Sequence, residues 1–368
     1  MSHHQEQIEK LRREIQELQA SADWYRRTYH DRRLAGVVRD RLQRRYPAIA
    51  RHRGADLETR IRRYIDQNPL TVKQLDRAEP VSIIMLSFNR VEDTRRAIRA
   101  IYRYTRPPFE VIILDNNSNE ETRRELRRMA RRYRHLTVVL ETVNLGCAGG
   151  RVKAQRFASH DYLLFLDNDI MVSPYYLENL FAQLYRSDAV AGVCCKVVFP
   201  DGRIQFNGGR MLQEDGYALY SLYDEGRPFD EEATNQVHDC QWIPGGATLW
   251  RRKVFEQFEI DGNMRGSFED NEISLRMIRA GYTLANAPGA IVIHDHYDFK
   301  NTDFKQKEID YFRARNHAGR IQDALLHFYQ KHQLIFSFSW KNNPWDIIWN
   351  LNSREEILRF IAEKTHAR

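Results

Sequence analysis

The stretch Tyr162-Leu163-Leu164-Phe165-Leu166-Asp167-Asn168-Asp169 joins a short, mostly apolar run to two carboxylates. A run of this length, preceded by a helical pattern, predicts a buried β-strand. Because unpaired charge is costly to bury, Asp167 and Asp169 are expected where the strand leaves the sheet. Open α/β sheets bind ligands at this edge, and carboxylate oxygens suit Mg²⁺ or Mn²⁺. The alternative interpretation is a turn whose Asp and Asn cap the next helix.

Strand and helix patterns alternate along the chain from Val81 onward. The apolar runs predict strands at 81–87, 109–114, 137–140, 162–166 and 189–198. The amphipathic segments predict helices at 92–104, 120–134, 148–159, 174–186 and 271–280, the fourth with Pro174 in its first turn. Helices of this length between strands indicate a mainly parallel sheet with right-handed crossovers. The predicted fold class is therefore α/β, a Rossmann-like sheet flanked by helices, with helical extensions at both ends.

Changes in composition divide the chain into three predicted regions, 1–77, 78–300 and 301–368. The first holds 18 Lys and Arg against 11 Asp and Glu, and accounts for the whole net charge of +7. The other 291 residues, with 39 of each kind, are neutral. A neutral body argues against nucleic acid as its substrate. The basic region 1–77 is compatible with binding to nucleic acid, to an anionic membrane surface or to an acidic partner.

An apolar stripe marks the N-terminal region at alternating three- and four-residue steps. Its members are Ile8, Leu11, Ile15, Leu18, Ala22, Tyr25 and Tyr29. The stripe predicts either a short coiled coil, which forms a homodimer or binds a partner helix, or a helix that packs on its own chain. After it, Pro47, Gly54 and Asn68-Pro69 predict a series of short helices.

The C-terminal region is helical from about residue 305 and then aromatic over 334–349. Tryptophans beside lysine favour either a peripheral membrane contact or docking on the chain's own domain. No apolar run approaches the ~20 residues of a membrane span, and the N-terminus lacks the apolar region of a secretory signal. The four cysteines form no C-x-x-C pair or zinc spacing. The sequence therefore predicts a cytoplasmic protein with reduced thiols, peripheral at most on the inner face of the membrane.

Polar motifs follow four predicted strands and would meet at one edge of the sheet. Ser87-Phe88-Asn89-Arg90 offers an aromatic ring that stacks on a base or joins the core. Asp115-Asn116-Asn117-Ser118-Asn119 offers polar groups for a base or ribose, or forms an Asx turn. Asn144-Leu145-Gly146-Cys147-Ala148-Gly149-Gly150-Arg151 brings glycines, a helix N-terminus and a positive charge, or makes a plain strand-to-helix turn. The fourth motif is Asp167-Asn168-Asp169.

Three further features lie downstream of the alternating pattern. The first is the stretch Trp242-Ile243-Pro244-Gly245-Gly246. Glu269 and Asp270 begin a helical pattern, where carboxylates serve either as capping residues or as a general base. His294 ends an apolar strand, either as a satisfied core residue or as a metal ligand.

Together these motifs resemble the family-2 inverting glycosyltransferases of the GT-A fold, in order and spacing, from Val81 to about residue 296. The ends, 1–77 and 301–368, are not covered by the resemblance. It implies a metal-dependent transfer of a sugar from a nucleotide diphosphate sugar to an acceptor hydroxyl, with inversion.

The resemblance also implies roles for individual residues. Asp270 would be the catalytic base, with Glu269 the less favoured candidate. Mn²⁺ or Mg²⁺ would be bound by Asp169, Asp167 and His294. Phe88 would stack near the base, and Gly245 with Gly246 would lie against the donor sugar. The full set of implied donor contacts is Ser87, Phe88, Asn89, Arg90, Asp115, Asn116, Gly146, Arg151, Asp167, Asn168, Gly245 and Gly246.

Several substrate questions stay open at this point. Some UDP-sugar enzymes of this family carry an Asp where this chain has Asn116, so UDP-, dTDP- and GDP-sugars are all candidate donors. The acceptor is a glycan, a lipid, a protein or a small molecule. The alternatives are a binding protein without chemistry and a sugar-1-phosphate nucleotidyltransferase. The latter needs a glycine-rich loop after the first strand, and 87–92 contains no glycine.

Overall fold

The computed structural model describes residues 47–77, 79–264, 268–295, 318–338, 349, 351 and 353–366. Four parallel strands form one half of the main sheet, in the order β4-β1-β2-β3. They are β1 (Val81–Ser87), β2 (Phe109–Asp115), β3 (Leu136–Leu140) and β4 (Tyr162–Asp167). Ser87 pairs with Asp115, and Leu86 pairs with Asp167. The register therefore brings the polar motifs after these strands to the same edge, as the sequence predicted.

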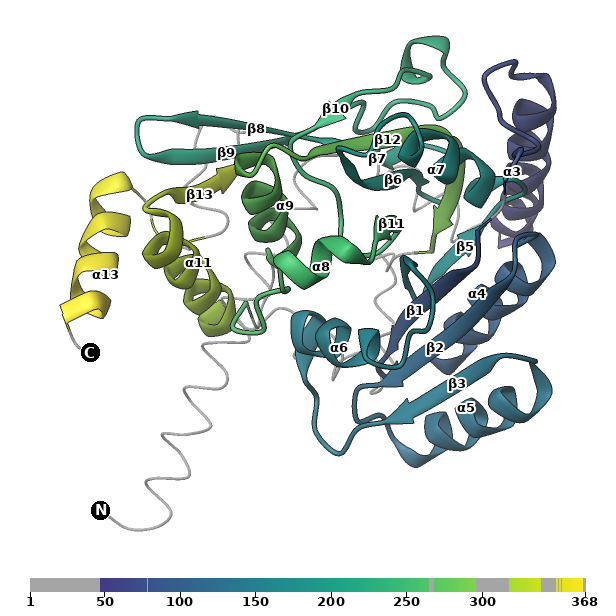
Figure 1. Ribbon diagram of the computed structural model, residues 1–368, viewed down its shortest axis with the longest axis horizontal. Helices are drawn as coiled ribbons and strands as arrows, with labels where there is room; N and C mark the ends of the chain where they lie inside the picture. The colour runs from purple at the N-terminus through teal and green to yellow at the C-terminus, as the bar shows by residue number, and fades with distance from the viewer. Residues whose placement is uncertain are drawn as a thin grey trace.

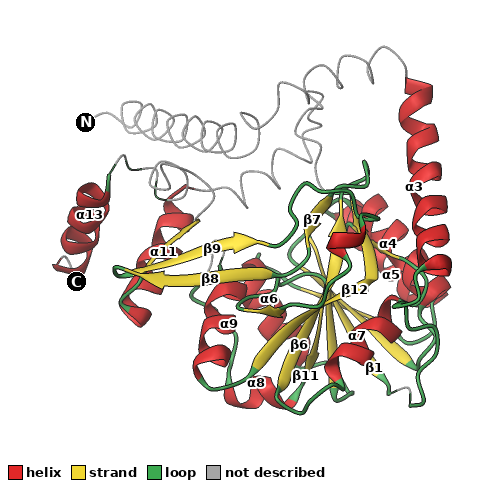
Figure 2. Ribbon diagram, turned by 90° about the horizontal axis from the view of Figure 1, so that it is seen from above, coloured by secondary structure: helices red, strands yellow, loops and turns green. Residues whose placement is uncertain are grey.

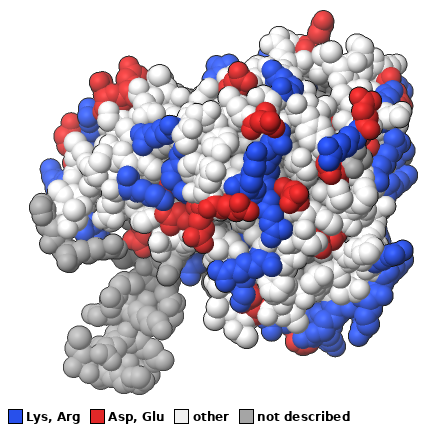
Figure 3. Space-filling model, viewed as in Figure 1, with Lys and Arg blue, Asp and Glu red and all other residues white. Residues whose placement is uncertain are grey.

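Helices cover both faces of this half of the sheet. They are α4 (Val91–Tyr104), α5 (Glu120–Arg132) and α6 (Gly146–Gln155). Helices α4 and α5 lie together on one face and α6 lies on the other, as right-handed crossovers require (Figure 1). On α5, Leu126 and Met129 are buried, whereas Arg124, Arg127 and Arg128 are exposed. This agrees with the predicted amphipathic helix. Figure 3 shows Lys and Arg side chains gathered at the lower right, the region where α5 lies in Figure 1.

The second half of the sheet is mixed. Its strands are β5 (Ile170–Val172), β6 (Val190–Val198), β7 (Ile204–Phe206), β10 (Asp239–Cys240), β11 (Thr248–Arg251) and β12 (Thr283–His294). Strand β11 is antiparallel to both β4 and β6, and β12 is parallel to β6. The short strand β5 pairs with the end of β12, so that Ile170 lies opposite His294. This pairing carries His294 to the acidic motif that precedes β5.

A three-stranded sheet projects from the main one toward α11 and α13 (Figure 2). This sheet contains β8 (Gly209–Glu214), β9 (Tyr217–Leu222) and β13 (Ile335–Phe338). The remaining helices lie around the two sheets: α7 (Tyr176–Leu184), η2 (Glu232–Thr234), α8 (Lys253–Gln257), α9 (Glu269–Arg279), α11 (Ala318–His332) and α13 (Arg354–His366). Phe336 stacks on Tyr220, and the indole N–H of Trp349 donates to the carbonyl of Phe336. Phe336 and Trp349 of the tail thus dock on the chain's own fold. Trp340 and Trp345 lie outside the described residues.

Two local predictions were wrong. The segment after Pro47 is not a series of short helices but one helix, α3 (Pro47–Gln67), which runs through Gly54. Its Leu57, Ile61 and Ile65 are buried against the main domain, and this packing offsets the ~1 kcal/mol that an interior glycine costs. Pro174 precedes α7 rather than lying in its first turn.

The predicted stripe from Ile8 to Tyr29 lies outside the described residues. Within the described part of the chain, no helix is long and apolar enough to cross a membrane.

Candidate active site

Three potential metal ligands meet at the edge where β4 and β12 end. One ligand atom each from Asp167, Asp169 and His294 lies within 4.8 Å of the others. Asp169 is 4% exposed and His294 is 8% exposed, and Nε2 of His294 lies 3.1 Å from Oδ1 of Asp169. Two carboxylates and an imidazole form a donor set that suits Mn²⁺ and accommodates Mg²⁺. The residues present therefore fit the predicted divalent ion.

Arg90 reaches the same acidic pair from the turn after β1. Its Nη1 is 3.0 Å from Oδ2 of Asp169, and its Nε is 2.9 Å from Oδ2 of Asp93. Asp93 also pairs with Arg96, whose Nη1 is 2.5 Å from Oδ2 of Asp295. The backbone N–H of Asp295 donates back to the carbonyl of Asp169 at 3.0 Å. Charges of alternating sign thus run from Asp169 to Asp295, and this backbone hydrogen bond closes the ring beside the metal-ligand group.

Arg151 of α6 joins the acidic motif to the start of α9. The guanidinium is buried, with Nη1 2.5 Å from Oε1 of Glu269 and Nη2 3.3 Å from Oδ1 of Asp167. Gly245 and Gly246 lie directly on this pair. A Cβ added at Gly245 would overlap the Arg151 guanidinium, and one at Gly246 would overlap the Asp167 carboxylate. Glycine at both positions therefore lets the backbone approach these charged groups without displacing them.

Asp270 lies in the first turn of α9, next to this bridge. Its Oδ2 accepts from the backbone N–H of Gly245 at 3.1 Å, and its Oδ1 accepts from that of Asn271 at 2.9 Å. Burial and the charge of Glu269 raise the pKa of Asp270 to about 7, against the opposing effect of Arg151. A carboxylate with a pKa near neutrality is suited to general-base chemistry. Glu269 is instead held in its ion pair, which favours Asp270 among the two predicted candidates.

Asp115 at the end of β2 has an unused hydrogen-bond acceptor. The side chain is fully buried, and its Oδ2 accepts from the N–H of Ser118 and from Nε of Arg123, both at 3.1 Å. Its Oδ1 is buried without a hydrogen-bond partner among the described residues. Because a buried unsatisfied acceptor is costly, this oxygen is a strong candidate for contact with an N–H of a ligand.

The asparagines that were predicted to contact the donor form hydrogen bonds with other groups of the protein. Asn116 donates to the carbonyl of Gly146 and accepts from the N–H of Leu145, both at 3.0 Å, so it holds the loop before α6. Asn89 accepts from the N–H of Asn119 at 3.0 Å. Asn168 donates to the hydroxyl of Thr94 in α4 at 2.9 Å. These amides brace the loops of the site.

The other two members of the first motif differ in exposure. Ser87 is buried, and its hydroxyl has no hydrogen-bond partner in the described part of the chain. Phe88 is partly exposed, so its ring is available at the edge of the sheet.

The sequence did not point to every residue around the metal-ligand group. Oε1 of Gln205 lies 2.7 Å from Nδ1 of His294, and Gln205 belongs to the three-residue strand β7, which is too short to leave a periodic signal. Asp93 and Arg96 have the i,i+3 spacing of a helix-surface pair, but nothing in that spacing relates them to Asp295.

Comparisons with known proteins give the same fold and family. Residues 82–258 match the family model described as glycosyl transferase family 2. The chain is 29% identical over 157 residues to the O-antigen biosynthesis protein RfbC of Myxococcus xanthus, a match that covers 41% of this chain and 12% of RfbC.

Two solved structures are similar as well. GalNAc-T7 with UDP, GalNAc and Mn²⁺ has a TM-score of 0.53 at 15% identity, over 83% of this chain and 63% of that one. The mannosyltransferase PcManGT from Pyrobaculum calidifontis, in complex with GDP-Man and Mn²⁺, has a TM-score of 0.49 at 17% identity, over 79% and 75%. Residues 82–258 therefore match glycosyl transferase family 2, and the chain has the GT-A fold.

Proposed function

We propose that this chain transfers a sugar from a nucleotide diphosphate sugar to an acceptor hydroxyl, with inversion at the anomeric carbon. The observation that carries the proposal is the Arg151 bridge. It ties Asp167 of the metal-ligand group to Glu269, which directly precedes the candidate base Asp270. A donor-binding carboxylate and a base are thereby fixed relative to each other, as single-displacement transfer requires.

The metal site would be formed by Asp167, Asp169 and His294. An ion of Mn²⁺ or Mg²⁺ held there supplies Lewis-acid stabilisation of the departing diphosphate. The solved structure of GalNAc-T7 contains UDP and Mn²⁺, which supports this ligand class for a chain of the same fold.

Asp115 is the proposed contact to the nucleotide base. Its unpaired Oδ1 would accept from an N–H on the edge of the base. Uracil, thymine and guanine all present a ring N–H, whereas the ring nitrogen of cytosine on that edge only accepts. UDP-, dTDP- and GDP-sugars are the proposed donors, and Arg151, Gly245 and Gly246 would line the donor sugar and diphosphate.

Asp270 is the proposed base. Its carboxylate takes the proton from the acceptor hydroxyl as that oxygen attacks the anomeric carbon, and the diphosphate leaves from the opposite face. The name of RfbC favours a glycan acceptor over a lipid, a protein or a small molecule. The match spans 12% of the length of RfbC.

The test is a thermal-shift panel of UDP-, dTDP-, GDP- and CMP-sugars, each with and without Mn²⁺, followed by transfer assays with the donors that bind. We expect a shift of several degrees for one base class, larger with metal. Binding of a donor with no turnover across many acceptors would favour a non-catalytic binding protein. If a well-folded protein shows no shift with any donor, the proposed donor site is wrong.

A further inference from the structure

We propose that Gln205 is a positioning residue that sets the tautomer of His294 for metal binding, an inference that rests on the proposed function. The amide Oε1 of Gln205 lies 2.7 Å from Nδ1 of His294. An amide oxygen only accepts, so Nδ1 carries the proton and, in the neutral ring, Nε2 carries the lone pair. That lone pair lies 3.1 Å from Oδ1 of Asp169, so the two atoms would be able to bind one cation together.

The two neighbours of Gln205 in strand β7, Ile204 and Phe206, are both fixed by contacts with the rest of the fold. The backbone of Ile204 donates to the carbonyl of Arg227 and accepts from the N–H of Gly226, both at 2.8 Å. On the other side, Phe206 is buried and its ring packs edge-on against Trp242 with centroids 5.0 Å apart. A side chain mounted on a backbone fixed in this way delivers its amide to one place.

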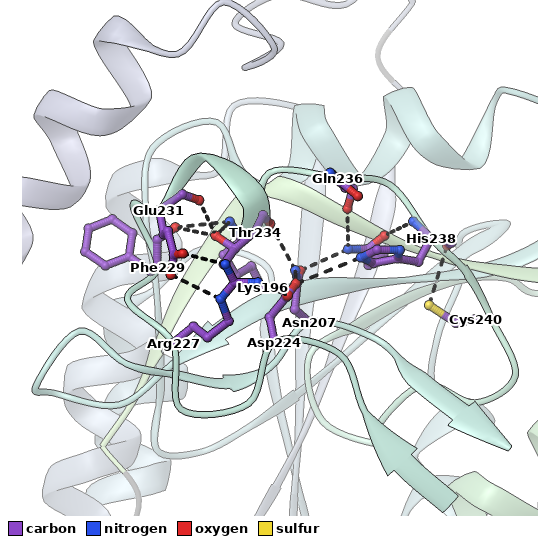
Figure 4. Close-up of polar contacts among 11 residues, drawn as sticks. Lys196, Asn207, Asp224, Arg227, Phe229, Glu231, Thr234, Gln236, His238 and Cys240 are labelled. Atoms are coloured by element: carbon purple, nitrogen blue, oxygen red, sulfur yellow. Dashed lines mark hydrogen bonds and ion pairs between the residues drawn. The ribbon is translucent and has the colours of Figure 1, made fainter.

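A buried amide cluster fixes the chain just after β7 (Figure 4). Asn207 is fully buried and donates to Oδ2 of Asp224 at 2.8 Å and to the carbonyl of Thr234 at 3.1 Å. Its Oδ1 accepts from Nδ2 of Asn286, on β12, at 2.9 Å. The cluster therefore joins β7 to β12, the strand that ends at His294. A satisfied buried network of this kind makes the relative position of its strands rigid.

Lys196 anchors the loop that completes this cluster. The side chain, on β6, is fully buried, and its Nζ donates to the carbonyl of Phe229 at 3.1 Å and to the hydroxyl of Thr234 at 3.3 Å (Figure 4). Burial lowers the pKa of Lys196 to about 8, against the raising effect of Asp224 and Asp230. The loop that contacts Asn207 is thus tied to the core of the sheet.

The experiment is a Mn²⁺ titration followed by the EPR signal of free Mn²⁺, with Mn²⁺ alone and in the presence of UDP, dTDP or GDP. Loss of an outer partner of a metal-bound histidine typically weakens metal binding by 10–100-fold, and we expect this range for Gln205→Leu. Gln205→Glu keeps an acceptor at Nδ1, and we expect it to bind Mn²⁺ at least as tightly as the wild type. The matched control is Gln213→Leu, because Gln213 also accepts a hydrogen bond, from Arg279, but lies on the β8–β9 hairpin.

Thermal unfolding of each variant separates positioning from stability. The inference is overturned if Gln205→Leu binds Mn²⁺ like the wild type, or if Gln205→Glu binds as weakly as Gln205→Leu. The inference is also overturned if Gln205→Leu binds Mn²⁺ more weakly but His294→Ala binds it like the wild type, because His294 would then not be a ligand. If the wild type binds no Mn²⁺ under any of these conditions, the metal site of the proposed function itself fails.

Discussion

Arg90 forms an ion pair with Asp169, with Nη1 3.0 Å from Oδ2, at a carboxylate that the proposed metal site needs. The arginine side chain is 10% exposed and the aspartate side chain 4% exposed, so water screens this pair little. The backbone of Arg90 has a φ of 51°, in the left-handed region that non-glycine residues seldom adopt. The protein thus holds a cation of its own against a carboxylate of the proposed metal site.

Replacing Arg90 should therefore favour the metal. We expect Arg90→Gln to bind Mn²⁺ about tenfold more tightly in the absence of nucleotide, since a charge-assisted hydrogen bond worth about 1.5–3 kcal/mol no longer competes. The matched control is Arg96→Gln, because Arg96 belongs to the same ring of charges and pairs with Asp93 and Asp295. Free Mn²⁺ measured by EPR gives both affinities. Weaker binding by Arg90→Gln would mean that the arginine orients Asp169 for the metal.

Asp270→Asn should separate catalysis from donor binding. The amide keeps an acceptor for the N–H of Gly245 but cannot take a proton, so we expect turnover to fall by about 10²–10⁴-fold. Donor affinity, measured by thermal shift with Mn²⁺, should stay within a few fold of the wild type. Turnover like that of the wild type would remove Asp270 from the role of base.

Glu269→Gln provides the contrast to that variant. Replacing the Glu269 carboxylate leaves the buried Arg151 with a single anionic partner, Asp167, at 3.3 Å, and we expect a loss of up to about 3–5 kcal/mol in the free energy of unfolding. Denaturant unfolding measures it. If Glu269→Gln is as stable as the wild type but inactive, the assignment of the base between the two residues must be reversed.

The strands, and the edge at which the site lies, follow from the sequence because their signals are local. Short apolar runs that end in polar residues mark β1, β2 and β4, and parallel pairing then aligns their carboxyl ends. Contacts between distant residues could not be read in this way. The Arg151–Glu269 pair spans 118 positions, and Gln205 reaches His294 from a strand of three residues. Helix α3 continues through Gly54 because tertiary burial outweighs local propensity.

The pKa of Asp270 predicts opposite effects of pH on activity and stability. The base must be deprotonated, so kcat/KM should rise with pH up to about 7 and then level. Folding raises this pKa from 3.8, so the folded chain binds the proton more tightly. The contribution of this proton to the free energy of unfolding is therefore complete below about pH 4 and is lost as pH rises through about 7.

Asp270→Asn lacks this titration and gives the matched comparison. The melting temperature of the wild type relative to this variant should fall between pH 5 and pH 8, as measured by thermal unfolding in a series of buffers. A difference that does not change with pH would show that the pKa of Asp270 is not raised by folding.

Gly246→Ala should damage the metal site through backbone geometry alone. The added Cβ would overlap the Asp167 carboxylate, so either the carboxylate or the 244–246 backbone has to move. We expect Mn²⁺ affinity to fall by at least tenfold, since a metal ligand displaced by a few tenths of an ångström no longer closes the coordination shell. Gly262→Ala is the control, because a Cβ at Gly262 meets no atom of the described chain within 4 Å. Equal Mn²⁺ affinity in the two variants would mean that Asp167 has room to move without losing the ion, and would leave Asp169 and His294 as the residues that hold it.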